Sequence, residues 1–552
     1  MVSSEDWDYI VVGGGLAGCV VASRLKEYKQ TARILVIEAG ADVSHDQGIL
    51  NFQSLDFSGQ KFAWTYETLP QEQLEKRKVD IPAGKALGGG SVINGCGWFR
   101  GSRADFDSWA DLVQEPRWSY EGQLQYFKKT EKWHDNENAE EHGHDGKFQI
   151  ESPVSTNREY PLADLTAQAW REMGIEPLPG NDMNAGANLG YGQLNENRRE
   201  GARQIAPLAY SLEGVTVMTD SHVASILLSD GENGGEPKAT GVRLTNETEI
   251  RGKQVIVSAG AYRTPQILMH SGLGPKAVLE KHGIRTVLDA PEVGQNFSDH
   301  VMVRMNWKLK DPSKGYAIDF TNPLLAKGTP INYVASTAVP RGDLEAALAR
   351  DDTDTGGKGV ADPDHPLLKR DFAMMETMVM YLGVPPLGPD GIHISSFLMA
   401  MKPTSRGTVT ISSRNPADPP VLDPKYYATE VDRYVWRHGL RRVARLMTGE
   451  TTVLGREVVE AEALPPDAGI EPLTIDASDE DLDKRVRAQG ISTYHGAGSC
   501  SMGSVVDSDL RFKGVRNLRV VDASVIPIAI GAHIQAAVYA LAEQAAFIIS
   551  EG

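Results

Sequence analysis

The chain has 552 residues, of which 41% are hydrophobic and 24% are charged, and its formal net charge is -18 at pH 7. This length and composition indicate a globular protein of two domains, or of one large domain with a second layer added. The acidic excess disfavours nucleic acid and anionic membranes as partners, because phosphate binding needs a basic surface. The cysteines Cys19, Cys96 and Cys500 are too few for a disulfide framework and do not lie at metal-ligand spacing, so we expect no metal.

The N-terminal segment MVSSEDWDYIVVGGG lacks the basic region and the separate apolar stretch of a signal peptide. The sequence also has no apolar stretch of the length that a membrane-spanning helix needs. We therefore expect a cytoplasmic protein, either a monomer or a homodimer, whose partner is a small-molecule substrate.

Residues 8–40 have the pattern of one βαβ unit: DYIVV is a strand, GGGLAG a turn, CVVASRLKEY a helix and ARILVIEAG the next strand. The turn contains the motif G-x-G-x-x-G, formed by Gly13, Gly15 and Gly18. Gly13 permits the tight turn, Gly15 lets the backbone approach a pyrophosphate, and Gly18 lets the helix pack closely on the strand. The pattern predicts dinucleotide binding.

Two further features of this unit suit a dinucleotide. The helix begins near Leu16 and Ala17, and its free N–H groups and positive dipole end would bind the pyrophosphate. Glu38 and Ala39 end the second strand, where a carboxylate can bind ribose hydroxyls. The turn alone does not separate FAD from NAD.

Further along the chain, residues 41–130 are predicted to be mostly irregular before a helical stretch, 131–160 to be loop-like, and 161–173 to form an amphipathic helix. Alternating strands over 215–258 return the chain to the nucleotide-binding domain. Strand-like runs over 300–480 predict a second, antiparallel domain. The polar insertion at 340–370 is interpreted as a mobile loop or lid. A strand opens 518–527, and a helix covers 534–549.

Four segments resemble signatures of the glucose-methanol-choline (GMC) oxidoreductases: 84–109 (GKALGGGSVINGCGWFRGSRADFDSW), 260–274 (GAYRTPQILMHSGLG), 292–300 (EVGQNFSDH), and 494–503 with 520–546. The resemblance implies an α/β FAD-binding Rossmann-like domain and an α+β substrate domain with an antiparallel sheet of six strands, interleaved in sequence. We assign residues 1–155, 200–300 and 485–552 to the first domain. Residues 156–199 and 301–484 are assigned to the second.

The resemblance also implies contacts with FAD. Gly90, Ser91, Asn94 and Gly95 would lie along the flavin and the pyrophosphate. The backbone of Val223 would meet the adenine, Asp522 and Ala523 would lie near the ribityl and pyrophosphate groups, and His533 and Ile534 would lie beside the flavin. Some members bind FAD covalently through a histidine at the position of Ile93, which cannot form this bond. We therefore predict non-covalent FAD.

Two histidines are the catalytic candidates. The resemblance implies that His495 is the principal base and that His533 fills the second position of the pair. A neutral imidazole suits removal of a hydroxyl proton while a hydride passes to flavin N5. His533 precedes the last helix, whose N-terminus disfavours an imidazolium, so we expect a neutral ring that can accept a proton.

Trp64, Trp98 and Phe397, together with Phe99 and the methionines of 375–400, are candidates for an apolar substrate wall. This composition favours an aromatic or polyketide-like alcohol of secondary metabolism, with O₂ or another compound as electron acceptor. Two alternatives stay open: a redox-neutral lyase or cyclase that uses the same histidines with structural FAD, and a flavin-binding protein without catalysis.

Overall fold

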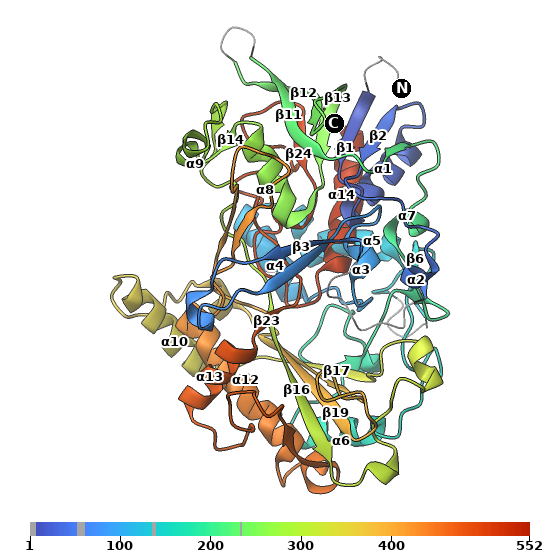
Figure 1. Cartoon of the computed structure of the whole chain (residues 1–552), viewed down its shortest axis with the longest axis vertical. Helices are drawn as coiled ribbons and strands as arrows, with labels where there is room; N and C mark the ends of the chain where they lie inside the picture. Colours follow the sequence, from blue (N-terminus) through green and yellow to red (C-terminus); the bar gives the residue numbers. More distant parts are fainter. Residues whose placement is uncertain (1–6, 52–60, 135–139, 232–234) are drawn as a thin grey trace.

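The computed structural model describes residues 7–51, 61–134, 140–231 and 235–552. Residues 1–6, on which the expectation of no signal peptide partly rests, lie outside the described residues. Two sheets with their helices form the upper and the lower half of the molecule in Figure 1. Within the described ranges, no helix is both long enough and apolar enough to cross a membrane.

The first sheet is a mixed sheet with a parallel centre. Its parallel strands run in the order β10 (Thr216–Met218), β2 (Ile34–Ile37), β1 (Trp7–Val12), β13 (Glu249–Val257) and β24 (Leu518–Val520). The antiparallel strands β12 (Lys238–Leu244) and β11 (Val223–Ser229) continue from the first part of β13. Nearly every residue of β1 and β2 is buried, as expected for parallel strands covered on both faces.

Two helices from opposite ends of the chain lie side by side on this sheet: α1 (Leu16–Tyr28) and α14 (Gln535–Glu551). Glu543 is fully buried on α14, and its carboxylate accepts hydrogen bonds from the Arg24 guanidinium of α1 and from the Tyr210 hydroxyl, each at 2.7 Å. A buried carboxylate is tolerated only when it is paired in this way. The contact therefore fixes the two helices relative to each other.

The second sheet is antiparallel throughout. Six of its strands form one path: β22 (Val459–Ala463), β16 (Val301–Leu309), β19 (His393–Ala400), β18 (Met375–Met380), β17 (Tyr333–Thr337) and β7 (Gly190–Gln193). A short seventh strand, β23 (Ile491–Ser492), pairs with β16, although the predicted substrate domain ends at residue 484. The amphipathic helix α12 (Glu430–Thr448) packs on β19, β22 and β18.

Shorter elements connect and cover these layers. The other α-helices are α2 (Gln47–Leu50), α3 (Gly90–Ile93), α4 (Arg103–Val113), α5 (Tyr120–Thr130), α6 (Ala163–Glu172), α7 (Ala206–Ala209), α8 (Gly260–His270), α9 (Lys276–Lys281), α10 (Arg341–Asp354), α11 (Pro366–Lys369) and α13 (Asp479–Gln489). The other strands are β3 (Ala63–Glu67), β4 (Asp80–Gly84), β5 (Glu131–Lys132), β6 (Phe148–Gln149), β8 (Arg198–Arg199), β9 (Ala202–Arg203), β14 (Leu273–Gly274), β15 (Leu288–Asp289), β20 (Thr408–Thr410) and β21 (Val421–Asp423).

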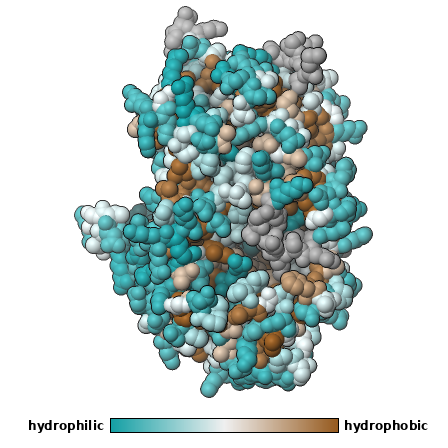
Figure 2. All heavy atoms as spheres, viewed as in Figure 1, coloured by the Kyte–Doolittle hydropathy of each residue, from teal (hydrophilic) through white to brown (hydrophobic). Residues whose placement is uncertain are grey.

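The predicted loop at 340–370 is wrong over most of its first half, because α10 is a regular helix there. Leu344, Ala347 and Leu348 are spaced by three and four residues and are buried, and the helix packs on α12. The outer surface of this lobe, at the left of Figure 1, is hydrophilic in Figure 2. Its many charged residues hid the short apolar stripe in the sequence.

The expectation of mostly irregular structure over 41–130 also missed a helix, α4. Ser102 caps its N-terminus by accepting a hydrogen bond from the Asp105 amide, while the Asp105 carboxylate accepts one from the Ser102 amide. This reciprocal pair is a capping box. The S-x-x-D spacing is visible in the sequence and could have predicted the start of the helix.

A buried ionic cluster surrounds His142. Its ring nitrogens lie 2.7 Å from Glu131 Oε1 and 2.8 Å from Asp182 Oδ2, and the Arg100 guanidinium also donates to Glu131. Burial lowers the pKa of His142, but the hydrogen bonds to Asp182 and Glu131 outweigh it and raise the pKa above its usual value. Two carboxylate partners favour an imidazolium, which donates from both nitrogens.

We expect His142→Gln to destabilise the protein more at low pH than at high pH. A histidine with a raised folded-state pKa contributes stability below its unfolded pKa and loses it as pH rises through the folded pKa. Removing one partner of a buried ion pair costs about 3–5 kcal/mol. Thermal unfolding between about pH 5.5 and pH 9 measures this difference. His45→Gln, at an exposed site, is the control, and an equal loss at every pH would contradict the assignment.

Candidate functional site

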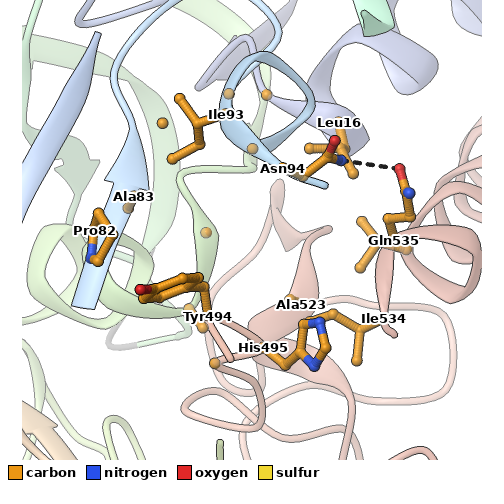
Figure 3. A pocket seen from close by; sticks show the side chains of 18 of the residues that line it. Leu16, Pro82, Ala83, Ile93, Asn94, Tyr494, His495, Ala523, Ile534 and Gln535 are labelled. Atoms are coloured by element: carbon orange, nitrogen blue, oxygen red, sulfur yellow. Dashed lines mark hydrogen bonds between the residues drawn. The ribbon is translucent and has the colours of Figure 1, made fainter. Parts of the chain in front are cut away.

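Residues from both sheets line a cavity of about 460 Å³. Val12 and Ile37, at the ends of β1 and β2, contribute to one side, and residues of β16, β18 and β19 contribute to the other. Figure 3 shows the cavity with Ile93 and Asn94 on one side and Tyr494, His495 and Ile534 on the other.

Most of the residues predicted to bind the cofactor line this cavity. They are Gly13, Gly15, Leu16, Ala17, Glu38, Ala39, Gly90, Asn94, Gly95, Val223, Asp522, Ala523, His533 and Ile534. Gly18 and Ser91 lie behind its surface. A Cβ on Gly18 would lie 1.9 Å from the Gly13 carbonyl oxygen, so this glycine serves close packing. The Ser91 hydroxyl donates to the Gly88 carbonyl and accepts from the Ala206 amide, so it braces the loop.

The main chain forms a cradle that leaves no room for side chains. Gly89 has a φ of +51°, and a Cβ there would lie 2.7 Å from the Gly15 Cα. Gly13 has a φ of +99°, and its Cβ would lie 2.4 Å from the Ser258 carbonyl oxygen. Helix α1 begins at Leu16 without a side-chain cap. Its free amides therefore face the cavity, which suits a pyrophosphate.

Glu38 lies at the end of β2 and is buried. Its carboxylate accepts hydrogen bonds from the Gly14 and Gly40 amides, both at 2.8 Å. Burial raises its pKa to about 7, against the effect of these amides. Each oxygen keeps a second lone pair, so the carboxylate can also accept from a ribose hydroxyl.

Asn94 ties the loop at 84–95 to α14. Its Nδ2 donates to Gln535 Oε1 at 3.0 Å (Figure 3), and its Oδ1 accepts from the Cys96 amide and the Arg203 guanidinium. The adjacent Ile93 presents only an alkyl side chain to the cavity. An alkyl side chain cannot form a covalent bond to the flavin, so the site fits FAD that is bound non-covalently.

The structure brings His495 and His533 together, with ring centroids 4.9 Å apart and planes at 71°. His495 Nδ1 lies 3.0 Å from His300 Nδ1 and 3.0 Å from Thr493 Oγ1. Burial, followed by the charge of His533 and that of His300, lowers the pKa of His495 well below its usual value. The ring is therefore neutral near pH 7 and can accept a proton.

His533 has a partner that the sequence did not reveal. Its Nε2 lies 2.8 Å from Glu376 Oε1, and Phe99 stacks on its ring with a centroid separation of 5.0 Å. The carboxylate is buried on β18. Nε2 donates to this carboxylate, so only Nδ1 of the ring can accept a proton. The sequence predicted a ring that accepts a proton, and the structure limits that role to one nitrogen. The pairing of Glu376 across domains left no local signal in the sequence.

The three aromatic residues predicted to bind the substrate lie in different places. Phe397 lines the cavity beside four methionines, Met302, Met378, Met380 and Met399; we call these five residues the methionine wall. Trp64 also lines the cavity, but its ring lies 5.7 Å from the ring of His222, next to Val223. This places Trp64 at the predicted adenine end.

Trp98 does not line the cavity. It is fully buried between Phe148 and Tyr539, and its Nε1 donates to Glu131. Its bulk fills the core of the first domain, so we withdraw it as a substrate residue. The segment 340–370 contributes no residue to the cavity lining in the part of the chain that the structure describes, and its role as a lid stays a prediction.

A dinucleotide cradle that faces a histidine pair defines a nucleotide-dependent redox enzyme. Family models described as GMC oxidoreductase match residues 7–302 and 403–542. The chain is 39% identical over 553 residues to the GMC-type oxidoreductase acuG of Aspergillus aculeatus, covering 98% of this chain and 99% of that protein. It is 30% identical to pyranose dehydrogenase 2 of Leucoagaricus meleagris, covering 100% and 94%. A solved fungal aryl-alcohol oxidase matches with a TM-score of 0.82 and 26% identity, covering 100% and 99%.

The chain belongs to the GMC oxidoreductase family. This confirms three predictions from the sequence: the family resemblance, the two-domain fold and the FAD cofactor. The enzyme is an FAD-dependent oxidoreductase that acts on CH–OH groups.

We expect Gly15→Ala to reduce FAD retention without unfolding the protein. A Cβ at Gly15 meets only the Gly89 Cα, at 3.8 Å, which is an ordinary contact, but it enters the space where the pyrophosphate approaches. The ratio of flavin to protein absorbance after purification should fall by about tenfold, which corresponds to about 1.4 kcal/mol. Circular dichroism should be unchanged. Gly342→Ala, in open space on α10, is the control; undiminished flavin in Gly15→Ala would contradict the role of the cradle.

Proposed function

We propose that the enzyme oxidises an aromatic or polyketide-like alcohol, with His495 as the base that removes the hydroxyl proton. The observation that carries this proposal is the position of a neutral imidazole in the same cavity as the methionine wall. His533 lies across from His495 and is held by Glu376. The two rings together limit how a substrate hydroxyl can lie beside His495.

Oxidation of the alcohol removes a proton from its hydroxyl group and a hydride from its carbinol carbon. His495 takes the hydroxyl proton, which makes the carbinol carbon a better hydride donor. His533, whose Nε2 donates to Glu376, keeps only Nδ1 as an acceptor, so it packs beside the substrate rather than donating to its oxygen. Bound FAD supplies the hydride acceptor at N5, so the alcohol leaves as an aldehyde or ketone. Positioned acid–base groups contribute about 10²–10⁴ to the rate of such reactions.

The second sheet presents an apolar surface to the substrate. In the antiparallel register, Met378 is opposite Phe397 and Met302 is opposite Met399, so these side chains lie on one face. Methionine side chains are flexible and polarizable, and they adapt to flat aromatic rings. Among the described residues of this sheet that line the cavity, none is acidic, so a cationic alcohol would have no carboxylate partner there.

The relatives are compatible with this substrate class. The aryl-alcohol oxidase acts on an aromatic alcohol by its name, and acuG is a GMC-type oxidoreductase of a fungus. We propose that FAD is bound non-covalently and that O₂ or another compound reoxidises it. A role in secondary metabolism is part of this proposal, as are the domain boundaries given above.

Anaerobic addition of substrate tests the proposed function. We expect 4-methoxybenzyl alcohol to bleach the flavin absorbance, and choline and glucose to leave it unchanged at equal concentration. The aldehyde product should appear in equal amount to the reduced flavin. A compound that is turned over while the flavin stays oxidised would instead favour redox-neutral lyase or cyclase chemistry.

His495→Ala should lower kcat by about 10²–10⁴ and leave FAD content unchanged, because the base is lost while the cradle is kept. In the unaltered enzyme, the lowered pKa of His495 keeps the ring neutral as the pH falls. The acid limb of kcat/KM should therefore begin well below about pH 6.5, the usual histidine value. Stopped-flow flavin reduction measures both effects, and an unchanged rate in His495→Ala would exclude this base.

Phe397→Ser should raise KM for aromatic alcohols more than it lowers kcat. Phe397 contributes only apolar contact, which binds ground state and transition state alike. Val360→Ser, at an exposed site outside the cavity, is the control. A large fall in kcat with constant KM would show that the ring acts on the reacting atoms instead.

A further inference from the structure

The dipeptide Asp299–His300 precedes β16 and contacts the loop that carries His495. The Asp299 carboxylate accepts a hydrogen bond from the His495 amide at 2.8 Å, and its other oxygen accepts from the Ser492 and Tyr426 hydroxyls, each at 2.5 Å. Asp299 is buried. It therefore fixes the backbone of the loop, while the next residue contacts the ring of the base.

In the contact between the rings of His300 and His495, the two facing atoms are both Nδ1 nitrogens. His300 Nδ1 lies 3.0 Å from His495 Nδ1, so one of these nitrogens must carry a proton and the other must be bare. If His495 is the donor, its neutral ring has a bare Nε2. If His300 is the donor, Nε2 of His495 carries the proton and cannot act as a base. The direction of this bond therefore decides whether His495 can function.

Thr493 favours donation by His495. The Thr493 hydroxyl donates to the His300 carbonyl oxygen at 3.0 Å, which uses its only proton. The same oxygen lies 3.0 Å from His495 Nδ1. With its proton on the His300 carbonyl, this oxygen takes part in the contact only as an acceptor, which favours a proton on Nδ1 of His495.

The surroundings of His300 favour the same direction. The ring is buried, and its pKa is lowered to about 3 by burial and by the charges of His533 and Lys402, against the effects of Asp105 and the Met401 carbonyl. Neutral His300 has a single ring proton. The Met401 carbonyl raises the pKa of the ring, as a nearby acceptor of its proton does. Because Nδ1 faces His495, this favours the proton on Nε2. The bare Nδ1 is then an acceptor for His495.

We propose that His300 is a positioning residue that, with Thr493, holds the ring proton of His495 on Nδ1 and leaves Nε2 bare for the substrate hydroxyl. The ring proton of His495 then points to Nδ1 of His300, and the ring proton of His300 lies on its Nε2. This inference rests on the proposed function of His495 as the base. The tautomer of a histidine is set by the hydrogen bond at its other nitrogen, and here that bond is supplied by a second histidine.

The tautomer can be observed directly in the FAD-loaded enzyme by ¹⁵N NMR of ring-labelled histidines. Protonated and bare ring nitrogens differ in ¹⁵N shift, and His495→Gln assigns the signals. We expect a protonated Nδ1 and a bare Nε2 in His495 near neutral pH. The reverse assignment, or an imidazolium, would overturn the proposal.

Variants of His300 provide a matched pair. In His300→Asn, the amide oxygen replaces the bare Nδ1 as acceptor. His300→Leu has a similar volume but offers no acceptor. We expect His300→Asn to keep kcat within about threefold, and His300→Leu to lower it by about tenfold, since Thr493 remains as acceptor. The double variant His300→Leu, Thr493→Val should lose about 10² or more, as when a triad base takes the wrong tautomer.

A general packing defect would not give this pattern. It would affect His300→Asn as well as His300→Leu, and it would not move the ring proton of His495. A double variant that retains FAD, the tautomer and kcat would overturn the proposal. If the tautomer is as expected but no alcohol reduces the flavin, the proposed function fails while the positioning role stands. If alcohols reduce the flavin and the tautomer is reversed, the positioning role fails alone.

Discussion

The approach of two glycine-rich backbones sets the geometry of the cofactor site. The Gly88 amide donates to the Gly14 carbonyl at 2.7 Å, and the Gly15 and Gly89 main chains meet without an intervening side chain. Because main chain lies against main chain, this side of the cavity is stiff and its amides have fixed directions. The segment that follows Gly89 carries Asn94, whose bond to Gln535 links the cradle to the last helix. The position of the flavin side of the site thus depends on this contact.

Much of this arrangement was predictable from the sequence, because its signals are local. The motif at Gly13–Gly18 combines a strand, a turn and a helix in one short segment, and the long signatures around Asn94 and His495 indicated the family. The contacts that tune the histidines were not predictable. Glu376 reaches His533 from the opposite domain, and His300, the residue before β16, contacts the distant His495. Such pairs depend on the tertiary fold alone.

Two predictions that relied on residue type alone were wrong. Trp98 is adjacent to the flavin loop in sequence, but alternation of side chains sends it into the core while Phe99 lines the cavity. The charged residues of α10 suggested a loop, although a narrow apolar stripe is enough to attach a helix to α12. In both cases the identity of the neighbours, rather than of the residue, decided the outcome.

The pairing of α1 with α14 has a consequence for the biosynthesis of the enzyme. The cavity is lined by residues 12–17 near the start of the chain and by residues of 493–538 near its end. The ribosome makes residues 493–538 long after residues 12–17, so FAD cannot be enclosed until α14 has emerged. A prematurely terminated chain would leave the α14-facing surface of α1 uncovered and Arg24 without Glu543. Flavin capture therefore reports that α14 has docked on α1.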